Sequence, residues 1–240
     1  MSNEAPLPLP SGRASAESRR PLCLYILNFH GIGTPRHELP ASEQELWIDT
    51  SRFQAILDCV PGRSELRLTF DDANESDYSI ALPELKARNL NAQFFVVAGR
   101  IGQADYLSHR QVEALATAGM TVGNHGMRHR RWAGLNEREL HEELVEARDR
   151  LEQISGRPIQ AAACPFGSYN WLVIRELRAS GYRSVYTSDG GPAWENALIL
   201  PRTSIGRSQD IATIKRLGSD TPGWVLYFWR YAKLWLKRWR

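Results

Sequence analysis

The sequence predicts an α/β fold in which parallel strands alternate with helices and close into a barrel. Apolar runs typical of strands alternate at least six times with segments whose apolar residues recur at helical spacing. This alternation is typical of a parallel sheet with crossover helices. The polar clusters of interest directly follow strands, and barrels of this class place their sites at the carboxyl ends of their strands. A length of 240 residues suits one such barrel with terminal extensions.

The expected elements can be justified in order along the chain. Residues 22–29 form a continuous apolar run, which suits a strand buried on both faces. Residues 34–49 are expected to form a polar loop. Further strands are expected at 65–71, 92–97, 120–124, 159–164, 182–187 and 197–200. Between them, apolar residues spaced three and four apart predict helices, the longest over 136–155. Helix N-caps are expected at Ser108, Asn136 and Asn170.

Composition divides the chain into three segments. Residues 1–20 are rich in proline, serine, alanine and charge, so we expect a disordered leader there. Residues 21–207 would form the barrel, and residues 208–240 a basic, aromatic helical tail. The last twenty residues, 221–240, contain five basic residues, no acidic residue and four of the eight tryptophans. An amphipathic helix of this kind suits an anionic membrane surface or an assembly partner. The alternative is a helix packed on the barrel.

Charge and cysteine content limit the partners and the compartment. The net charge of +3 includes the five basic residues of 221–240, so the preceding residues carry about −2 and are not expected to bind nucleic acid. The three cysteines are far apart and form neither a disulfide framework nor a zinc-ribbon spacing. No signal-peptide pattern or membrane-span-length apolar run is present. We therefore expect a cytoplasmic protein, peripheral at the inner face of the membrane if the tail binds lipid.

The expected strand 65–71 leads into two adjacent carboxylates, Asp71 and Asp72. Successive strand side chains point to opposite sides, so the two can face different environments. Neighbouring carboxylates repel each other unless a cation, a proton or hydrogen bonds relieve the repulsion. A divalent metal bound by one of them would do so and leave the other free as a base. On its own, such a pair more often forms a turn or a helix cap.

His125 and His129 follow another expected strand and lie four residues apart, on one face if the turn is helical. Imidazole pairs at this spacing commonly bind zinc, and a third ligand leaves a fourth position open for water. Together with the aspartates, they supply a His₂-Asp set and a spare carboxylate. The alternative is a pair of solvated histidines in an arginine-rich loop, which would repel a cation.

Three segments together resemble the leading motifs of the NodB-type polysaccharide deacetylases, and in particular the exopolysaccharide-deacetylase branch. They are Thr69-Phe70-Asp71-Asp72, His125-x-x-x-His129 and Pro165-Phe166-Gly167. The resemblance spans roughly residues 22–207. It implies a distorted (β/α) barrel and a hydrolase that removes N-acetyl groups from an oligosaccharide, polysaccharide or lipid-linked glycan containing amino sugars. It also implies Zn²⁺ or another divalent transition metal as cofactor.

Matched residue by residue, the resemblance implies Asp71 as general base and Asp72, His125 and His129 as metal ligands. The metal would activate water and polarise the acetamide, and the base would accept the proton of that water. The oxyanion would rest on the metal and on a backbone N–H of the turn formed by Pro165, Phe166 and Gly167.

Two usual family features are missing. The third motif usually has an arginine two residues before its proline, but this chain has Ala163. Arg202, after a later strand, is the candidate to replace it. The late Leu-x-His acid motif has no counterpart, so His30 is the candidate acid, similar to a histidine used by the exopolysaccharide-deacetylase branch. Asp189 would orient His30 or simply form a turn.

Several alternatives remain open from the sequence. Trp132 and Trp194 lie beside the motif loops in sequence and would stack on sugar rings or pack beneath the loops. The same chemistry could deformylate a lipid-linked formamido sugar, which release of formate would reveal. A non-catalytic carbohydrate-binding relative could keep the barrel and the metal, without turnover of any amide.

Overall fold

The structure is a computed structural model that describes residues 22–36 and 38–217. The leader predicted at 1–20 and the tail helix predicted at 221–240 lie outside these residues. Of the tail predicted at 208–240, the structure describes residues 208–217, which include α8 (Ile211–Arg216). Arg63 Nη1 donates to the carbonyl of Ile214 in this helix at 3.3 Å, so α8 packs against the barrel. No described helix is long and apolar enough to cross a membrane.

The centre of the described chain is a sheet in the order β10-β8-β7-β6-β5-β4-β1-β11, in which every neighbouring pair on this path is parallel. The strands are β1 (Cys23–Phe29), β4 (Leu66–Asp71), β5 (Gln93–Val96), β6 (Thr121–Asn124), β7 (Ala161–Ala163), β8 (Ser184–Thr187), β10 (Ile199–Pro201) and β11 (Thr203–Ser204). β9 (Pro192–Trp194) runs antiparallel to the start of β1. Inside the expected polar loop, β3 (Trp47–Ile48) pairs with β2 (Gly31–Ile32).

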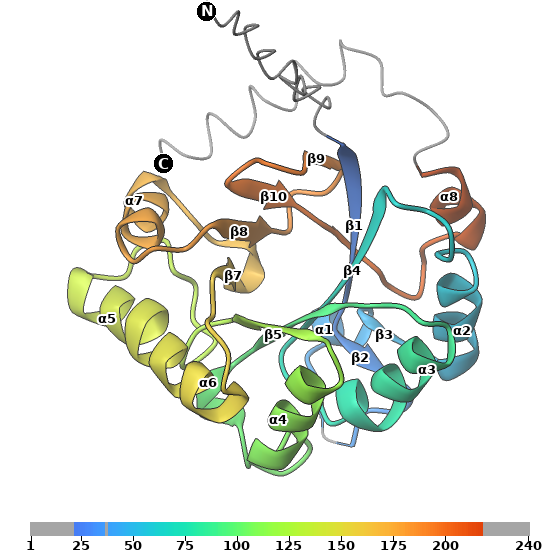
Figure 1. The fold of residues 1–240 in the computed structure, drawn as a ribbon, viewed down its shortest axis with the longest axis horizontal. Helices are drawn as coiled ribbons and strands as arrows, with labels where there is room; N and C mark the ends of the chain where they lie inside the picture. Colours follow the sequence, from blue (N-terminus) through green and yellow to red (C-terminus); the bar gives the residue numbers. More distant parts are fainter. Residues whose placement is uncertain (1–21, 37, 218–240) are drawn as a thin grey trace, which may run out of the picture.

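Most helices lie around the outside of the strands, as Figure 1 shows. In chain order, the α-helices of the described chain are α1 (Ala41–Gln44), α2 (Thr50–Leu57), α3 (Leu82–Ala87), α4 (His109–Thr117), α5 (Glu137–His141), α6 (Ala147–Ser155), α7 (Trp171–Ala179) and α8. Ser108 and Asn136 form capping boxes, and Asn170 accepts the N–H of Val173. The predicted alternation of strands and helices is confirmed. A π-helical turn, η3 (Glu142–Glu146), joins α5 to α6 within the helix expected over 136–155.

The sheet forms a nearly closed barrel whose two edges meet at a single residue. β10 ends at Pro201 on one edge, and β11 begins at Thr203 on the other. Arg202 is therefore the one residue between the two edge strands, at the seam of the barrel. Its side chain is fully buried.

Aromatic packing on the helix side of the sheet directs polar side chains into the barrel. Phe29, Phe70 and Phe94 stack across three strands with ring centroids 5.2 and 4.6 Å apart, and Phe53 of α2 packs edge-on against Phe29. Because strand side chains alternate between faces, Asp71 points away from these rings. Asn28 directly precedes Phe29 in β1, so the same alternation directs its side chain into the barrel beside Asp71.

Candidate active site

Asp71 ends β4 with a buried carboxylate that two side chains hold. Arg202 places Nη1 at 2.7 Å from Oδ1 and Nη2 at 2.7 Å from Oδ2, and Asn28 Nδ2 donates to Oδ2 at 2.9 Å. Burial by itself would raise the pKa of Asp71, but the charge of Arg202 reverses this effect and lowers the pKa to about 2. The carboxylate is therefore ionised at neutral pH and oriented by two parallel contacts.

Of the two partners of Asp71, the sequence predicts Arg202 but not Asn28. Arg202 lies where the replacement for Ala163 is expected, and it also donates to Asn28 Oδ1 at 2.8 Å. Sequence reasoning misses Asn28, because it lies inside the continuous apolar run of residues 22–29. The available signal was one amide inside a buried strand, since a buried polar group needs a hydrogen-bond partner.

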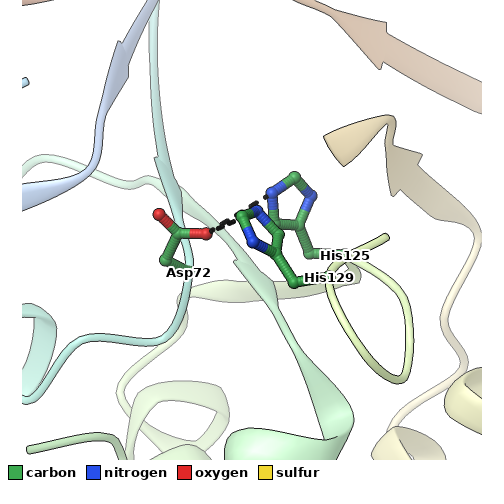
Figure 2. A group of neighbouring side chains, drawn as sticks. All are labelled: Asp72, His125 and His129. Carbon is green, nitrogen blue, oxygen red and sulfur yellow. Dashed lines mark ion pairs between the residues drawn. The ribbon is translucent and has the colours of Figure 1, made fainter. Parts of the chain in front are cut away.

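Asp72, His125 and His129 converge at the carboxyl ends of β4 and β6, as Figure 2 shows. Asp72 Oδ1 lies 3.0 Å from His129 Nε2 and 3.7 Å from His125 Nε2. One potential ligand atom from each residue lies within 4.8 Å of the others. Burial by itself would raise the pKa of Asp72, but its hydrogen bond with His129 holds the pKa well below the usual range.

The loop that carries the histidines is not helical, so the condition under which helical geometry would place both rings on one face is not met. Its backbone is left-handed at Gly126, with φ of 86°, and at His129, with φ of 54°. The buried carboxylate of Glu143 accepts the N–H of Met127 at 2.9 Å and shapes the loop from outside. A Cβ on Gly126 would lie 2.2 Å from Glu143 Oε2, so only glycine fits. The rings still meet, with centroids 5.1 Å apart.

Trp132 belongs to the support of this loop. It is fully buried, and its Nε1 donates to Glu143 Oε2 at 3.4 Å. It has no face to offer a sugar, so the predicted stacking role of Trp132 is wrong. Glu143 itself was missed, although a glutamate among the apolar positions Leu140, Leu144 and Ala147 was a visible signal.

The cluster fits a zinc-like ion. His125 Nδ1 lies 2.9 Å from the carbonyl oxygen of Ala163, which can only accept, so the Nε2 lone pair remains free. Burial lowers the pKa of His125 to about 4, which keeps the ring neutral at neutral pH, as a ligand must be. Tetrahedral bonds of 2.0–2.1 Å separate ligand atoms by ~3.3 Å, and the two distances to Asp72 Oδ1, 3.0 and 3.7 Å, bracket this value.

Arg100 is a further neighbour of the cluster that the sequence did not reveal. Its Nη1 lies 3.3 Å from Asp72 Oδ1, and its Nη2 lies 3.2 Å from His129 Nδ1. A guanidinium can only donate, so this contact favours the His129 tautomer with the proton on Nε2. Arg100 therefore opposes a metal at His129 both through its charge and through the tautomer it selects.

His30 follows β1 at the same end of the sheet. Its carbonyl accepts a hydrogen bond from Asn74 Nδ2 at 3.0 Å, which ties it to the segment after Asp72. Its Nδ1 is buried and finds no hydrogen-bond partner in the described part of the chain. His30, Asp72 and Arg100 line one narrow cavity. Asp189 accepts from Tyr169 and Thr187 at 2.9 and 2.7 Å, and whether it orients His30 stays a prediction.

The third motif forms a short turn, η4 (Pro165–Gly167), with Phe166 in a left-handed conformation at φ of 55°. The N–H of Gly167 donates to Cys164 within the turn, whereas no acceptor for the N–H of Phe166 is found among residues 22–36 and 38–217. Phe166 is therefore the available oxyanion donor of this turn, and that role stays a prediction. Phe166 is 48% exposed, and the centroid of its ring lies 4.5 Å from that of the His129 ring.

Two exposed tryptophans lie at opposite ends of the barrel. Trp171 begins α7, directly after the third motif, and is 59% exposed. It therefore lies on the carboxyl side of the strands, where sequence reasoning missed it. Trp194 pairs with Cys23 at the start of β1, at the amino ends of the strands. That position is remote from the site, so the expectation that Trp194 stacks on a substrate sugar there is wrong.

Comparison with known proteins decides the family. The family model described as polysaccharide deacetylase matches residues 60–185, which include the β4, His125–His129 and third-motif segments. The chain belongs to the polysaccharide deacetylase family.

Individual relatives are distant. The chain is 23% identical to the putative polysaccharide deacetylase YxkH of Bacillus subtilis over 74% of its own length and 68% of the relative's. It is 25% identical to a peptidoglycan-N-acetylglucosamine deacetylase of Bacillus cereus over 68% of its own length and 55% of the relative's. The chain thus spans little more than half of the second relative.

Solved structures share the fold of this family member. The Streptococcus pyogenes deacetylase PplD, in complex with acetate, matches with a TM-score of 0.72 and 22% identity, over 84% of this chain and all of that one. IcaB from Ammonifex degensii matches with a TM-score of 0.68 and 22% identity, over 82% of this chain and 98% of that one. Both likenesses extend to the barrel as a whole.

Proposed function

We propose that this polysaccharide deacetylase family member is a metal-dependent hydrolase that removes N-acetyl groups from amino sugars in an oligosaccharide, polysaccharide or lipid-linked glycan. One observation carries the proposal. An ionised, braced carboxylate, Asp71, adjoins a convergent Asp72–His125–His129 cluster, with His125 Nε2 3.8 Å from Asp71 Oδ2. A relative named as a peptidoglycan-N-acetylglucosamine deacetylase supports an amino-sugar substrate.

Asp72, His125 and His129 would hold Zn²⁺ or another divalent transition metal, which supplies an acidified water and a polarised acetyl carbonyl. Asp71 accepts the proton of the attacking water. A pKa of about 2 makes this carboxylate a weak base, so acidification of the water is essential to the transfer. The N–H of Phe166 donates to the carbonyl oxygen as negative charge develops there.

His30 is the proposed acid that gives a proton to the departing amine. Its support is a buried Nδ1 without a hydrogen-bond partner among the described residues, beside a cavity that Asp72 also lines. His30→Ala should lower kcat for acetate release by about 100-fold or more, the typical contribution of a positioned acid. Unchanged turnover in this variant would remove His30 from the mechanism.

The decisive experiment measures bound metal and acetate release in three proteins. The wild type should hold about one metal per chain and release acetate from N-acetylglucosamine oligomers. His125→Ala should lose the metal. Asp71→Asn, which keeps the shape of the base, should retain the metal and lose acetate release. A wild type that binds no metal after reconstitution would reject the hydrolase.

Other products would assign the alternatives. Formate release from a formamido sugar, without acetate release from acetamido sugars, would identify a deformylase. Metal binding without turnover of any amide would identify a non-catalytic carbohydrate-binding protein.

We also propose a cytoplasmic location, supported by three widely separated cysteines, Cys23, Cys59 and Cys164, whose spacing matches no disulfide framework. Cell fractionation tests it directly. The proposed attachment of residues 221–240 to an anionic membrane is supported by their composition alone. Deleting them should abolish binding of the protein to anionic vesicles, and unchanged binding would reject the attachment.

A further inference from the structure

The segment around His129 contains three arginines with very different partners. Arg128 Nε lies 2.6 Å from Glu142 Oε1. Arg130 contacts the carboxylates of three glutamates in the α5–α6 segment, each at 3.1 Å. Arg131 is exposed, and within the described residues it forms no ion pair or hydrogen bond. Its positive charge is therefore not neutralised locally, unlike the charges of its two neighbours.

Arg131 is nevertheless held in place beside the Asp72–His125–His129 cluster. Its Cζ lies 4.7 Å from the centroid of the Phe166 ring. That ring in turn lies 4.5 Å from the centroid of the ring of His129. The guanidinium is thus only one aromatic ring away from a proposed metal ligand. A guanidinium stacked on an aromatic ring keeps its N–H groups available to an acceptor.

The carboxylates of the site are already paired and leave Arg131 without an acidic partner. Asp71 faces Arg202 at 2.7 Å, and Asp72 lies 3.3 Å from Arg100. The guanidinium of Arg131, beside the exposed Phe166, is therefore available to contact a substrate. Planar, forked N–H donors of this kind suit carboxylate and phosphate groups.

We propose that Arg131 binds an anionic group of the glycan, a carboxylate or a phosphate, next to the sugar whose amide is cleaved. This inference rests on the proposed function, because it assigns the substrate class of the same site. Arg131 thereby selects acidic glycans over neutral ones. Phe166 supports it by holding the guanidinium over the ring and by offering the sugar an exposed apolar face.

The test compares wild type, Arg131→Gln and Arg128→Gln by calorimetric binding and by kcat/KM for acetate release. Three ligands are used: a neutral N-acetylglucosamine oligomer, an oligomer of equal length in which one sugar bears a carboxylate, and N-acetylglucosamine phosphate. Arg131→Gln should weaken binding of at least one acidic ligand about tenfold, as expected for loss of one charge-assisted contact. Binding of the neutral oligomer should stay within about twofold.

The matched controls separate a specific contact from general charge. Arg128→Gln removes the same charge three residues away, but from an arginine already paired with Glu142, so it should leave all affinities unchanged. Arg131→Lys should recover part of the loss, because it restores charge without the fork. Which acidic ligand responds distinguishes a carboxylated sugar from a sugar phosphate.

The outcomes distinguish this inference from the proposed function. Acidic and neutral ligands bound equally by the wild type, or equal losses in Arg131→Gln and Arg128→Gln, would overturn the role of Arg131 even if acetate is released. Selective loss of acidic ligands in Arg131→Gln, with no acetate release from any ligand, would support Arg131 as the anion-binding residue and reject the hydrolase.

Discussion

Arg202 and Asp71 are 131 residues apart in the sequence, yet two parallel 2.7 Å contacts join the guanidinium to the carboxylate inside the barrel. Both side chains are essentially buried, so water cannot replace either partner. The pair determines the protonation state of Asp71, because the charge of Arg202 outweighs the effect of burial on its pKa.

Replacing Arg202 with Met should therefore destabilise the protein and weaken catalysis. An unpaired buried carboxylate costs ~3–5 kcal/mol, and the pKa of Asp71 should rise in the variant. Urea unfolding and the pH profile of kcat/KM measure the two effects, and the acid limb of the profile should move to higher pH. Arg67→Met, which removes a half-exposed arginine 3.9 Å from Glu195, should cost less than ~1 kcal/mol. Equal stability losses in both variants would contradict the role of the buried pair.

Replacing Arg100 with Gln should tighten metal binding by about tenfold, because it removes the repulsion between the guanidinium and a bound cation. The variant removes a cation 3.3 Å from Asp72 Oδ1 and the donor that opposes the metal-binding tautomer of His129. Zinc titration against a chromophoric chelator gives the dissociation constant. Arg36→Gln, which removes an exposed arginine 3.7 Å from Glu75, serves as the control with unchanged affinity. Weaker binding in Arg100→Gln would show that Arg100 instead orients the ligands.

The raised pKa of the buried Asp77 carboxyl should make the stability of the protein depend on pH. Asp77 lies in the π-helical turn η1 (Asp77–Ala81), and burial, followed by the charges of Asp72 and Asp71, raises its pKa well above 3.8. The folded protein keeps this proton at pH values where the unfolded chain releases it, so stability is lost as pH rises from about 3.8 through the folded pKa.

Asp77→Asn should be more stable than wild type at pH 7 when both are metal-free, because an amide needs no proton to stay neutral. Between about pH 3.8 and the folded pKa of Asp77, the difference in free energy of unfolding between Asp77→Asn and wild type should grow by up to ~1.4 kcal/mol for each pH unit. At pH 4 this difference should nearly vanish. Urea unfolding at several pH values measures it. A difference that does not change with pH would contradict this account.

Trp171→Ala should reduce affinity for long N-acetylglucosamine oligomers about tenfold, because a sugar ring packed on an indole face buries apolar area. A monosaccharide should be affected less. Trp194→Ala removes an exposed indole from the opposite end of the barrel and should change neither affinity. Titration of tryptophan fluorescence with oligomers of increasing length measures both variants, and matching losses would show that Trp171 is not a distinct sugar contact.

The barrel and the cluster could be predicted because both follow from local patterns. Carboxyl ends of parallel strands meet at one face, so Asp72 and His125 had to lie near each other once their strands were recognised. Asn28, Arg100 and Glu143 could not be found in this way, since their roles arise from contacts across 43, 29 and 16 residues respectively.

Backbone conformation was also beyond the reach of sequence patterns. Asp72, His129 and Phe166 all have left-handed φ angles, at 80°, 54° and 55°, a conformation that is uncommon for residues other than glycine. The rings of His125 and His129 therefore meet without the helical turn that their four-residue spacing would allow. Such strained positions concentrate at functional sites, where surrounding contacts enforce them.

The seam at Arg202 has a consequence for the order in which the protein becomes active during synthesis. The aspartate pair and both histidines leave the ribosome long before Arg202, which is delivered only with β11, the strand that pairs Thr203 with Leu27 of β1. Until β11 docks, Arg202 is not in place beside Asp71, so the nascent barrel contains the Asp71 carboxylate without the cation that pairs with it. Activity should thus appear abruptly with the closing strand, and stalled chains that end before residue 202 should remain inactive even though they contain Asp72, His125 and His129.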